Sequence, residues 1–123
     1  MDMRLELVII PVRDTDRAKA FYVDQVGFHA DHDQRVNEQL RFVQLTPPGS
    51  ACSIAFGEGI GEGEPGSVKG LQMVVDDADA VHAELQGREV EVSDVEDLAW
   101  GRFVYFSDPD GNSWALQELP PRP

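Results

Sequence analysis

Cysteines and long hydrophobic runs are nearly absent from this chain of 123 residues. Its single cysteine, Cys52, excludes an internal disulfide and fits a reducing compartment. No apolar run approaches the ~20 residues of a membrane span, and the start of the chain, Met1 to Arg4, lacks the pattern of a signal peptide. We therefore expect a single cytoplasmic domain with its own core and no membrane partner.

Positive charge is also scarce. The chain has 10 basic and 23 acidic residues, which gives a formal net charge of −13 at pH 7. A field of this sign repels nucleic-acid phosphates and anionic membranes, so we expect no nucleic-acid partner. Two interpretations of the charge stay open: it keeps a small protein soluble, or it surrounds a groove that attracts a cationic ligand.

What the chain does have is a hairpin pattern that occurs twice. Asp108 to Gly111 is a turn sequence, because Pro109 fixes φ at the second turn position and Gly111 tolerates a left-handed conformation. The β-rich runs Phe103–Phe106 and Ser113–Leu116 flank this turn. The earlier copy of the pattern consists of Leu40–Thr46, the turn Pro47-Pro48-Gly49, and Ala51–Phe56. Two such hairpins indicate a fold made of two similar halves.

The segment upstream of each hairpin is repeated as well. Four residues recur with the same type 63 residues later: Val12, Asp14, Asp16 and Ala20 match Val75, Asp77, Asp79 and Ala83. Each match opens a helical pattern, capped by Asp14 or Thr15 in the first half and by Asp76 or Asp77 in the second. Gly27 is suited to end the first helix. Each half is therefore predicted to be a strand, a helix and three strands.

Three further segments complete the prediction. Phe28–Asp33 is expected to form a short strand before a polar turn at Gln34–Gln39, and Val90–Val92 a strand before an acidic loop at Ser93–Gly101. Gly57–Gly66 contains five glycines, three glutamates and one proline, a composition that predicts a mobile connector.

Two motifs carry a resemblance to a known family. The strand-to-helix entry Val12–Tyr22, followed by Gly27-Phe28, and the terminal Asp108–Asn112 resemble the vicinal oxygen chelate superfamily over residues 4–119. That superfamily holds glyoxalase I, extradiol dioxygenases, fosfomycin-resistance enzymes and bleomycin-resistance proteins. The resemblance implies an α+β fold, in which paired βαβββ modules form curved mixed β-sheets with a concave cavity. It divides a single domain, residues 1–123, into module one (about 4–57), a connector (58–68) and module two (about 69–119).

The resemblance also implies where a metal ion would bind. Enzymes of this superfamily hold a divalent ion with His or Glu side chains, one from an inward position on each of four strands. The matching residues here are Leu7, Ser53, Ala115, and Gly70 or Leu71. None of them is a normal metal ligand, so we expect neither a metal ion nor another cofactor.

The only dense donor cluster lies elsewhere, in His29-Ala30-Asp31-His32-Asp33. Strand alternation would place His29, Asp31 and Asp33 on one face and His32 on the other. We interpret this cluster as a solvated edge strand whose charges oppose edge-to-edge pairing.

Counting along the strands gives a set of cavity residues. The predicted ligand-binding residues are Leu7, Ile9, Ser53, Gln72, Trp100, Tyr105, Ala115 and Gln117. They form an apolar floor with two amides, which suits an organic ligand held by shape and a few hydrogen bonds. Trp100 could stack on a planar ligand or cover the edge of the core.

Hairpin register decides which side chains reach this cavity. In the last hairpin, a bulged turn would pair Tyr105 with Ala115 and place both on the cavity side. The same register in the first half would put Gln44 under the helix, where its amide would lack a partner. The sequence does not resolve this conflict.

These patterns predict a metal-free, small-molecule binding protein of the glyoxalase/bleomycin resistance type, which sequesters a drug or metabolite and forms a homodimer. One alternative is a metal-dependent lyase or dioxygenase with displaced ligands. A second is a metal-free, isomerase-like enzyme. The sequence indicates no catalytic residue.

Overall fold

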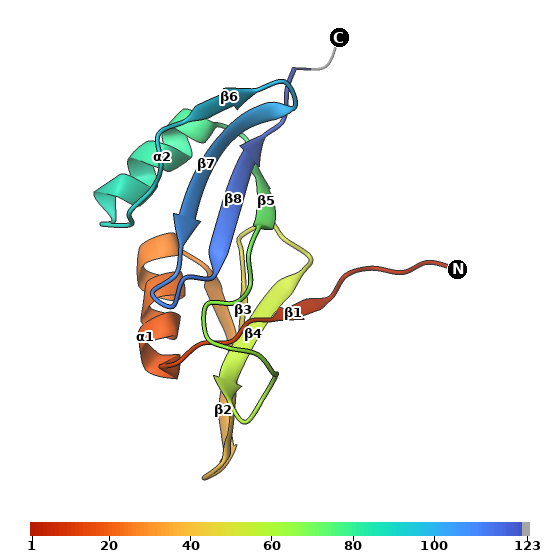
Figure 1. Cartoon of the computed structure of the whole chain (residues 1–123). Coiled ribbons are helices and arrows are strands. Elements are labelled where there is room, and N and C mark those ends of the chain that lie inside the picture. Colours follow the sequence, from red (N-terminus) through yellow and green to blue (C-terminus); the bar gives the residue numbers. More distant parts are fainter. Residues whose placement is uncertain (122–123) are drawn as a thin grey trace.

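The computed structural model describes residues 1–121, so the last two residues of the chain, which belong to the predicted domain, lie outside the described part. Two βαβββ modules follow one another, as predicted, in an α+β fold (Figure 1). Module one contains β1 (Leu7–Ile9), α1 (Thr15–Ala20), its π-helical continuation η1 (Phe21–Val26), β2 (His29–Asn37), β3 (Leu40–Thr46) and β4 (Ser53–Glu58). Module two contains β5 (Leu71–Val75), α2 (Ala78–Gly87), β6 (Glu96–Leu98), β7 (Gly101–Ser107) and β8 (Ser113–Glu118).

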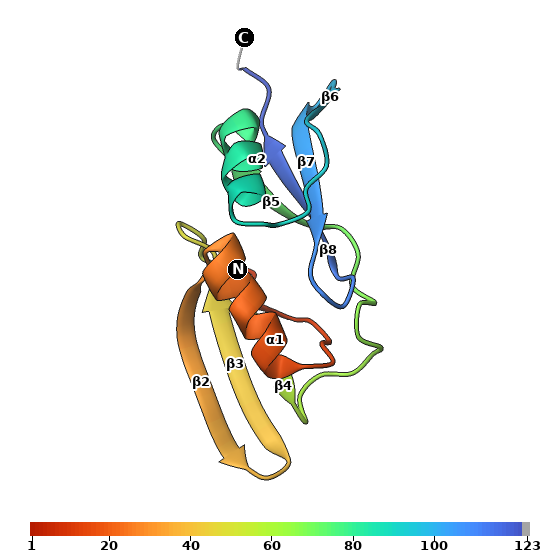
Figure 2. The same cartoon turned by 90° about the vertical axis from the view of Figure 1, so that its left-hand side faces the viewer.

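Each module contributes one sheet of four strands. The first sheet has the order β1-β4-β3-β2 and the second the order β5-β8-β7-β6. In both, the first strand pairs in parallel with the last, and the remaining pairs are antiparallel. The helices lie on one side of the two sheets (Figures 1 and 2). We call the opposite side of both sheets the open face.

Both helices begin where the sequence predicts. The side chain of Asp14 accepts a hydrogen bond from the Arg17 amide at 3.1 Å, and that of Asp77 accepts one from the Ala80 amide at 3.1 Å. These bonds satisfy amides that have no partner inside the helix. Gly27 follows η1 with φ 97° and turns the chain into β2, which confirms its predicted role.

Strand boundaries differ from the prediction in three places. β2 runs to Asn37, so most of the predicted polar turn is strand, and β4 begins at Ser53 rather than Ala51. The predicted strand at Val90–Val92 is wrong: this segment is not strand, and β6 lies inside the predicted acidic loop. Val90 is buried in the core instead. Ser93 lies beside Tyr105, where a neighbouring strand would pair with β7. The Ser93 hydroxyl accepts a hydrogen bond from the Tyr105 amide at 2.9 Å.

The connector is anchored at its C-terminal end, contrary to the mobility that its composition predicts. Its amide at Gly66 donates to the carbonyl oxygen of Pro11 at 3.3 Å. Gly66 also has φ 83°, and a Cβ there would overlap the carbonyl oxygen of Asp110. Glycine therefore lets the connector approach the terminal turn more closely than any side chain would allow.

A single aromatic core joins the two modules. The indole of Trp114 packs on Tyr22 and Phe28, with ring centroids 5.9 and 5.7 Å apart, and stacks on Phe106 at 6.0 Å. Tyr22 and Phe28 belong to module one, and Trp114 and Phe106 to module two. The modules therefore bury their aromatic side chains against each other.

A buried hydrogen-bond network runs through this core. The Tyr22 hydroxyl donates to the Asp108 carboxylate at 2.8 Å and accepts from the Trp114 indole N–H at 3.0 Å. Asn112 donates to the same carboxylate at 2.8 Å and to the Pro11 carbonyl at 2.9 Å. Burial, with the charge of Asp108 beside it, raises the pKa of Tyr22, so the hydroxyl keeps its proton. The terminal turn thus locks module two onto module one.

We predict that Tyr22→Phe lowers the free energy of unfolding by about 2 kcal/mol, because it leaves the Trp114 indole N–H without an acceptor and takes one donor from a buried carboxylate. Urea denaturation measures this. The matched control is Tyr105→Phe, because Tyr105 lies outside the network. Equal stability of the two variants would contradict the assigned role of the Tyr22 hydroxyl.

The end of α2 gives a second prediction. Glu89 has φ 66°, a left-handed conformation that disfavours a residue with a Cβ, whereas the nearby Gly87 does not have positive φ. We expect Glu89→Gly to raise the melting temperature, with a gain of about 1 kcal/mol or less, because relief of strain exceeds the added chain entropy. Glu91→Gly is the matched control. It removes the same charge at a residue whose φ is not positive, so it should not raise the melting temperature. A lower melting temperature for Glu89→Gly would contradict this explanation.

Candidate functional site

Strand register places six of the predicted cavity residues on the open face. In the second sheet, Gln72 lies opposite Ala115, and Ala115 lies opposite Tyr105, so the three form one row. Gln117 follows two residues after Ala115 on the same face. In the first sheet, Leu7 lies opposite Ser53. The predicted pairing of Tyr105 with Ala115 is confirmed.

Three cavities adjoin these rows. One of about 520 Å3 extends from Gln72 and Val74 to Phe28 and Leu85. The remaining two share lining residues with each other. One, of about 260 Å3, lies between the sheets and is lined by Ser53, Gly70 and Gln72 among others. We call it the inter-sheet cavity. The other, of about 570 Å3, lies on the second sheet and includes Tyr105, Ala115 and again Gly70. Gly70 and Trp114 line both of these cavities, which are therefore neighbours.

Trp100 and Ile9 occupy the margins of this face. Trp100 precedes β7 and is 61% exposed, so it does not cover the core edge and its ring is free to meet a ligand. Its carbonyl oxygen accepts from the Gln117 amide at 2.8 Å, which ties the turn to β8. Ile9 is 45% exposed and lies against the connector, where a Cβ at Gly61 would come within 2.6 Å of its side chain.

The first sheet is more polar on its open face than predicted. Gln44 lies opposite Ala55 rather than under the helix. Its register differs from that of the second hairpin by three residues, because Val43 pairs with Phe56 and not with Ser53. An odd shift moves every side chain of a strand to the other face. Gln44 therefore faces solvent on the open side, which resolves the conflict left by the sequence.

The predicted arrangement of the His29–Asp33 cluster is wrong. β2 is an edge strand, as expected, but its register shifts between Ala30 and His32. Asp31 is the extra residue of this bulge, and its carboxylate accepts a hydrogen bond from the Thr46 hydroxyl. The Thr46 hydroxyl also lies 2.6 Å from that of Ser53. Sequence alternation could not reveal this chain of three side chains, because a bulge breaks the alternation.

Asp33 turns to the helix side instead. Its carboxylate binds Lys19 of α1 at 2.8 Å and Arg41 at 2.9 Å. Hydrogen bonds from Arg41, and then from Lys19, hold the pKa of Asp33 well below its usual range. Arg41 also reaches Asp16 at 2.8 Å. These ion pairs fasten α1 to the first sheet and leave Asp33 out of the open face.

The residues at the four metal positions do not fit a metal ion. Leu7 and Ala115 have no donor atom, Gly70 has no side chain, and Ser53 has only a hydroxyl group. Elsewhere in residues 1–121, no three His, Cys, Asp or Glu side chains gather where they could hold a metal. The alternative of a metal enzyme with displaced ligands therefore has no donor set in the described part of the chain.

The acidic surface near the larger cavity is partly neutralised. Asp97 binds Arg102 at 2.7 Å, and the same guanidinium binds Asp79 at 2.7 Å. Glu91 lines the larger cavity, and Glu96 lies close enough to Tyr105 to add to the effect of burial in raising the pKa of its hydroxyl. Glu91 and Glu96 therefore place negative charge beside this cavity, whereas the charge of Asp97 is paired with Arg102.

The family model described as Glyoxalase/Bleomycin resistance protein/Dioxygenase superfamily matches residues 4–116. The chain belongs to this superfamily. TnmS3, an antibiotic binding protein from Streptomyces sp. CB03234, is 38% identical, with a TM-score of 0.87 over 97% of this chain and 98% of that one. A glyoxalase/bleomycin resistance protein from the same organism is 39% identical, with a TM-score of 0.81 over 93% and 99% of the two chains.

A curated relative, the uncharacterized protein YetH of Bacillus subtilis (strain 168), is 23% identical over 96% of this chain and 100% of its own length. The fold predicted for the superfamily is thus confirmed over nearly the whole chain. Among residues 1–121, no helix has both the length and the apolar character needed to cross a membrane.

Proposed function

We propose that this chain binds an organic small molecule on its open face and holds it without a metal ion. One observation carries the proposal: the open face has two adjoining cavities, and the side chains at the superfamily's metal positions there are apolar, absent or a single hydroxyl. Such a site recognises a ligand by shape and hydrogen bonds. The similarity to TnmS3, an antibiotic binding protein, supports an organic ligand of this kind.

Aromatic side chains supply part of the contact area. The ring of Tyr105, which lines the larger cavity, is stacked on the buried ring of Phe103, with centroids 6.0 Å apart and planes 6° from parallel. Trp100 directly precedes the same strand and is 61% exposed. Aromatic rings offer large contact area and little rotamer entropy to lose, so this side of the site suits a planar, unsaturated part of the ligand.

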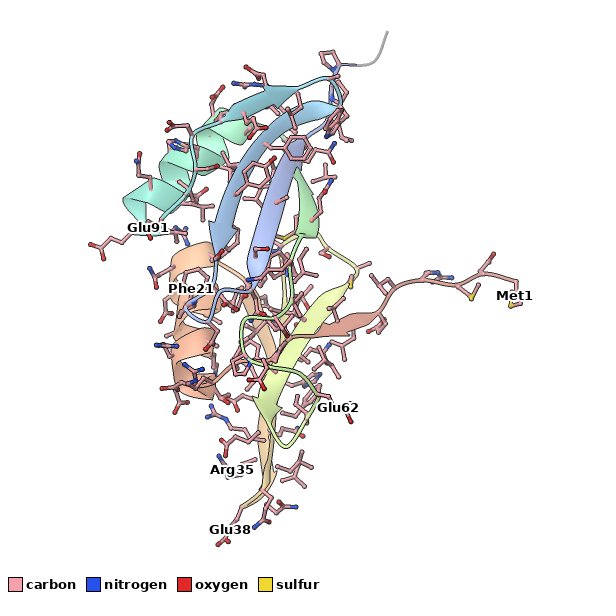
Figure 3. The ribbon with its side chains drawn as sticks, in the orientation of Figure 1. Met1, Phe21, Arg35, Glu38, Glu62 and Glu91 are labelled. Carbon is pink, nitrogen blue, oxygen red and sulfur yellow. The ribbon has the colours of Figure 1, made fainter. Side chains whose placement is uncertain are left out.

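A second copy of the chain is proposed to cover the open face. Val74 is 61% exposed there, and the N-terminal arm carries Met3 and Leu5, which are 84% and 70% exposed. Figure 3 shows Met1 at the tip of this arm, far from the body of the molecule and on the side away from the helices. Apolar side chains set out in this way gain free energy when another surface removes them from water. The homodimer would thereby close the ligand site.

We predict that Trp100→Ala raises the dissociation rate of a cationic naphthalene, naphthylmethylamine, by about tenfold, because the loss of stacking area costs about 1–2 kcal/mol. The association rate should change little, since the long-range charge is unaltered. Stopped-flow naphthalene fluorescence measures both rates. Trp100→Phe keeps a smaller aromatic ring, so its dissociation rate should lie between those of the wild-type protein and Trp100→Ala. If Trp100→Ala releases the probe at the wild-type rate, Trp100 does not contact the ligand.

We also predict a dimer. Light scattering at micromolar concentration should give about twice the chain mass of 13.6 kDa. Val74→Asp should weaken the dimer at least about tenfold, because it places a charge in an apolar contact. Val36 is equally exposed, at 61%, but lies near the tip of the β2–β3 hairpin between Arg35 and Glu38 (Figure 3), so Val36→Asp is the matched control. A monomeric wild-type protein would refute the proposed closure of the site.

A further inference from the structure

Two chains of side-chain hydrogen bonds end at the inter-sheet cavity. The first crosses the first sheet from Asp31 through Thr46 to Ser53. The second crosses the second sheet from the carbonyl oxygen of Trp100 through Gln117 to Gln72. Ser53 and Gln72 both line this cavity. The first chain fixes the hydrogen-bonding character of the group that it presents to a ligand, and the second holds the Gln72 amide in place.

The carboxylate of Asp31 determines which group donates and which accepts in each hydrogen bond of the first chain. An ionised carboxylate only accepts hydrogen bonds, so the single hydroxyl proton of Thr46 is committed to Asp31. The Thr46 oxygen can then only accept from Ser53, whose hydroxyl lies 2.6 Å away. The Ser53 proton is thus committed in turn. Ser53 is left with oxygen lone pairs alone to offer to the cavity.

Amide orientation in the second chain follows from its carbonyl end in the same way. The Trp100 carbonyl only accepts, so Gln117 must turn its NH2 group toward it, at 2.8 Å. The carbonyl oxygen of Gln117 then faces Gln72 and accepts from the Gln72 amide at 2.7 Å. This bond uses one of the two N–H groups of the Gln72 amide, so Gln72 still offers its second N–H and its oxygen. Gln117 is buried and Gln72 exposed, so the chain leads from the interior toward the ligand.

We infer that the inter-sheet cavity selects ligands that donate a hydrogen bond, from a hydroxyl or an amine, through one fixed acceptor, Ser53 Oγ. This inference rests on the proposed binding function and assigns Ser53 as a specificity-determining residue, with Thr46 as its positioning residue. A ligand that presents only an ether or carbonyl oxygen to Ser53 would set its lone pairs against those of the Ser53 hydroxyl. Leaving polar groups unpaired costs more than the bond itself contributes.

Charge makes an amine the better of the two donors. Asp31 stands at the far end of the first chain, and its hydrogen bond to Thr46 polarises the chain toward the cavity. The formal net charge of −13 adds a field of the same sign. An ammonium group donates up to three hydrogen bonds and accepts none, so it can bond to Ser53 Oγ and to the free Gln72 oxygen together, whereas a hydroxyl group donates only one.

The test compares two isomers and an amine. Naphthylmethanol donates a hydrogen bond, and its isomer methoxynaphthalene only accepts, so the pair differs in hydrogen bonding and little else. Calorimetric titration of the wild-type protein should show naphthylmethanol bound at least about tenfold more tightly than methoxynaphthalene. Naphthylmethylamine should bind more tightly than both.

Breaking the first chain should change this preference. Thr46→Val removes the acceptor for the Ser53 proton, which then becomes free to donate to an ether oxygen. The preference for naphthylmethanol over methoxynaphthalene should fall at least about threefold. Ser67→Ala, which removes an exposed hydroxyl in the connector, should leave the preference unchanged.

The outcomes separate this inference from the proposed function. Equal affinity of wild-type protein for the two isomers would overturn the inference and leave small-molecule binding intact. Failure of all three probes to bind would count against the proposed function instead. Neutron diffraction of the deuterated protein tests the chains without any ligand. A Ser53 deuteron directed into the cavity would overturn the inference.

Discussion

The buried carboxylate of Asp108 is the constraint on which the rest of the structure depends. Removing an ionised group from water costs free energy, so both oxygens of the carboxylate must accept hydrogen bonds. One oxygen accepts three backbone amides of its own turn, from Asp110, Gly111 and Asn112. The other accepts from the Asn112 side chain within the turn and from the Tyr22 hydroxyl of module one. The carboxylate therefore has all its donors only when the helix of the other module is in place.

That requirement explains why two separate four-stranded sheets behave as one domain. Neither sheet shares a strand with the other, and each is closed by its own helix. The terminal turn replaces a shared strand, with the aromatic rings packed around it. Asp108 and Trp114 also line the larger cavity, so the residues that join the modules form part of the wall of the binding surface.

The sequence predicts most of the fold and only part of the site. Repeated turns and caps fix the order of the elements, because Pro109, Asp14 and Asp77 act through local chemistry that depends on neighbours in the chain. The bulge at Asp31 and the register of Gln44 are set by contacts across strands, which carry no local signal. The side chains of Thr46 and Asp31 were missed for that reason. The strand expected at 90–92 failed because tertiary packing of Val90 outweighed its β preference.

The three-residue difference in register between the two hairpins gives the binding surface a direction. A receptor built from two equivalent halves would present nearly the same groups to either end of a ligand, and a molecule could enter it in two flipped poses. Here the first sheet offers hydroxyl groups backed by a carboxylate, and the second offers amides and stacked rings. The two ends of the ligand site therefore differ in chemistry. A duplicated module that has lost its symmetry in this way can favour one orientation of a ligand over the reverse, in addition to selecting the ligand by shape.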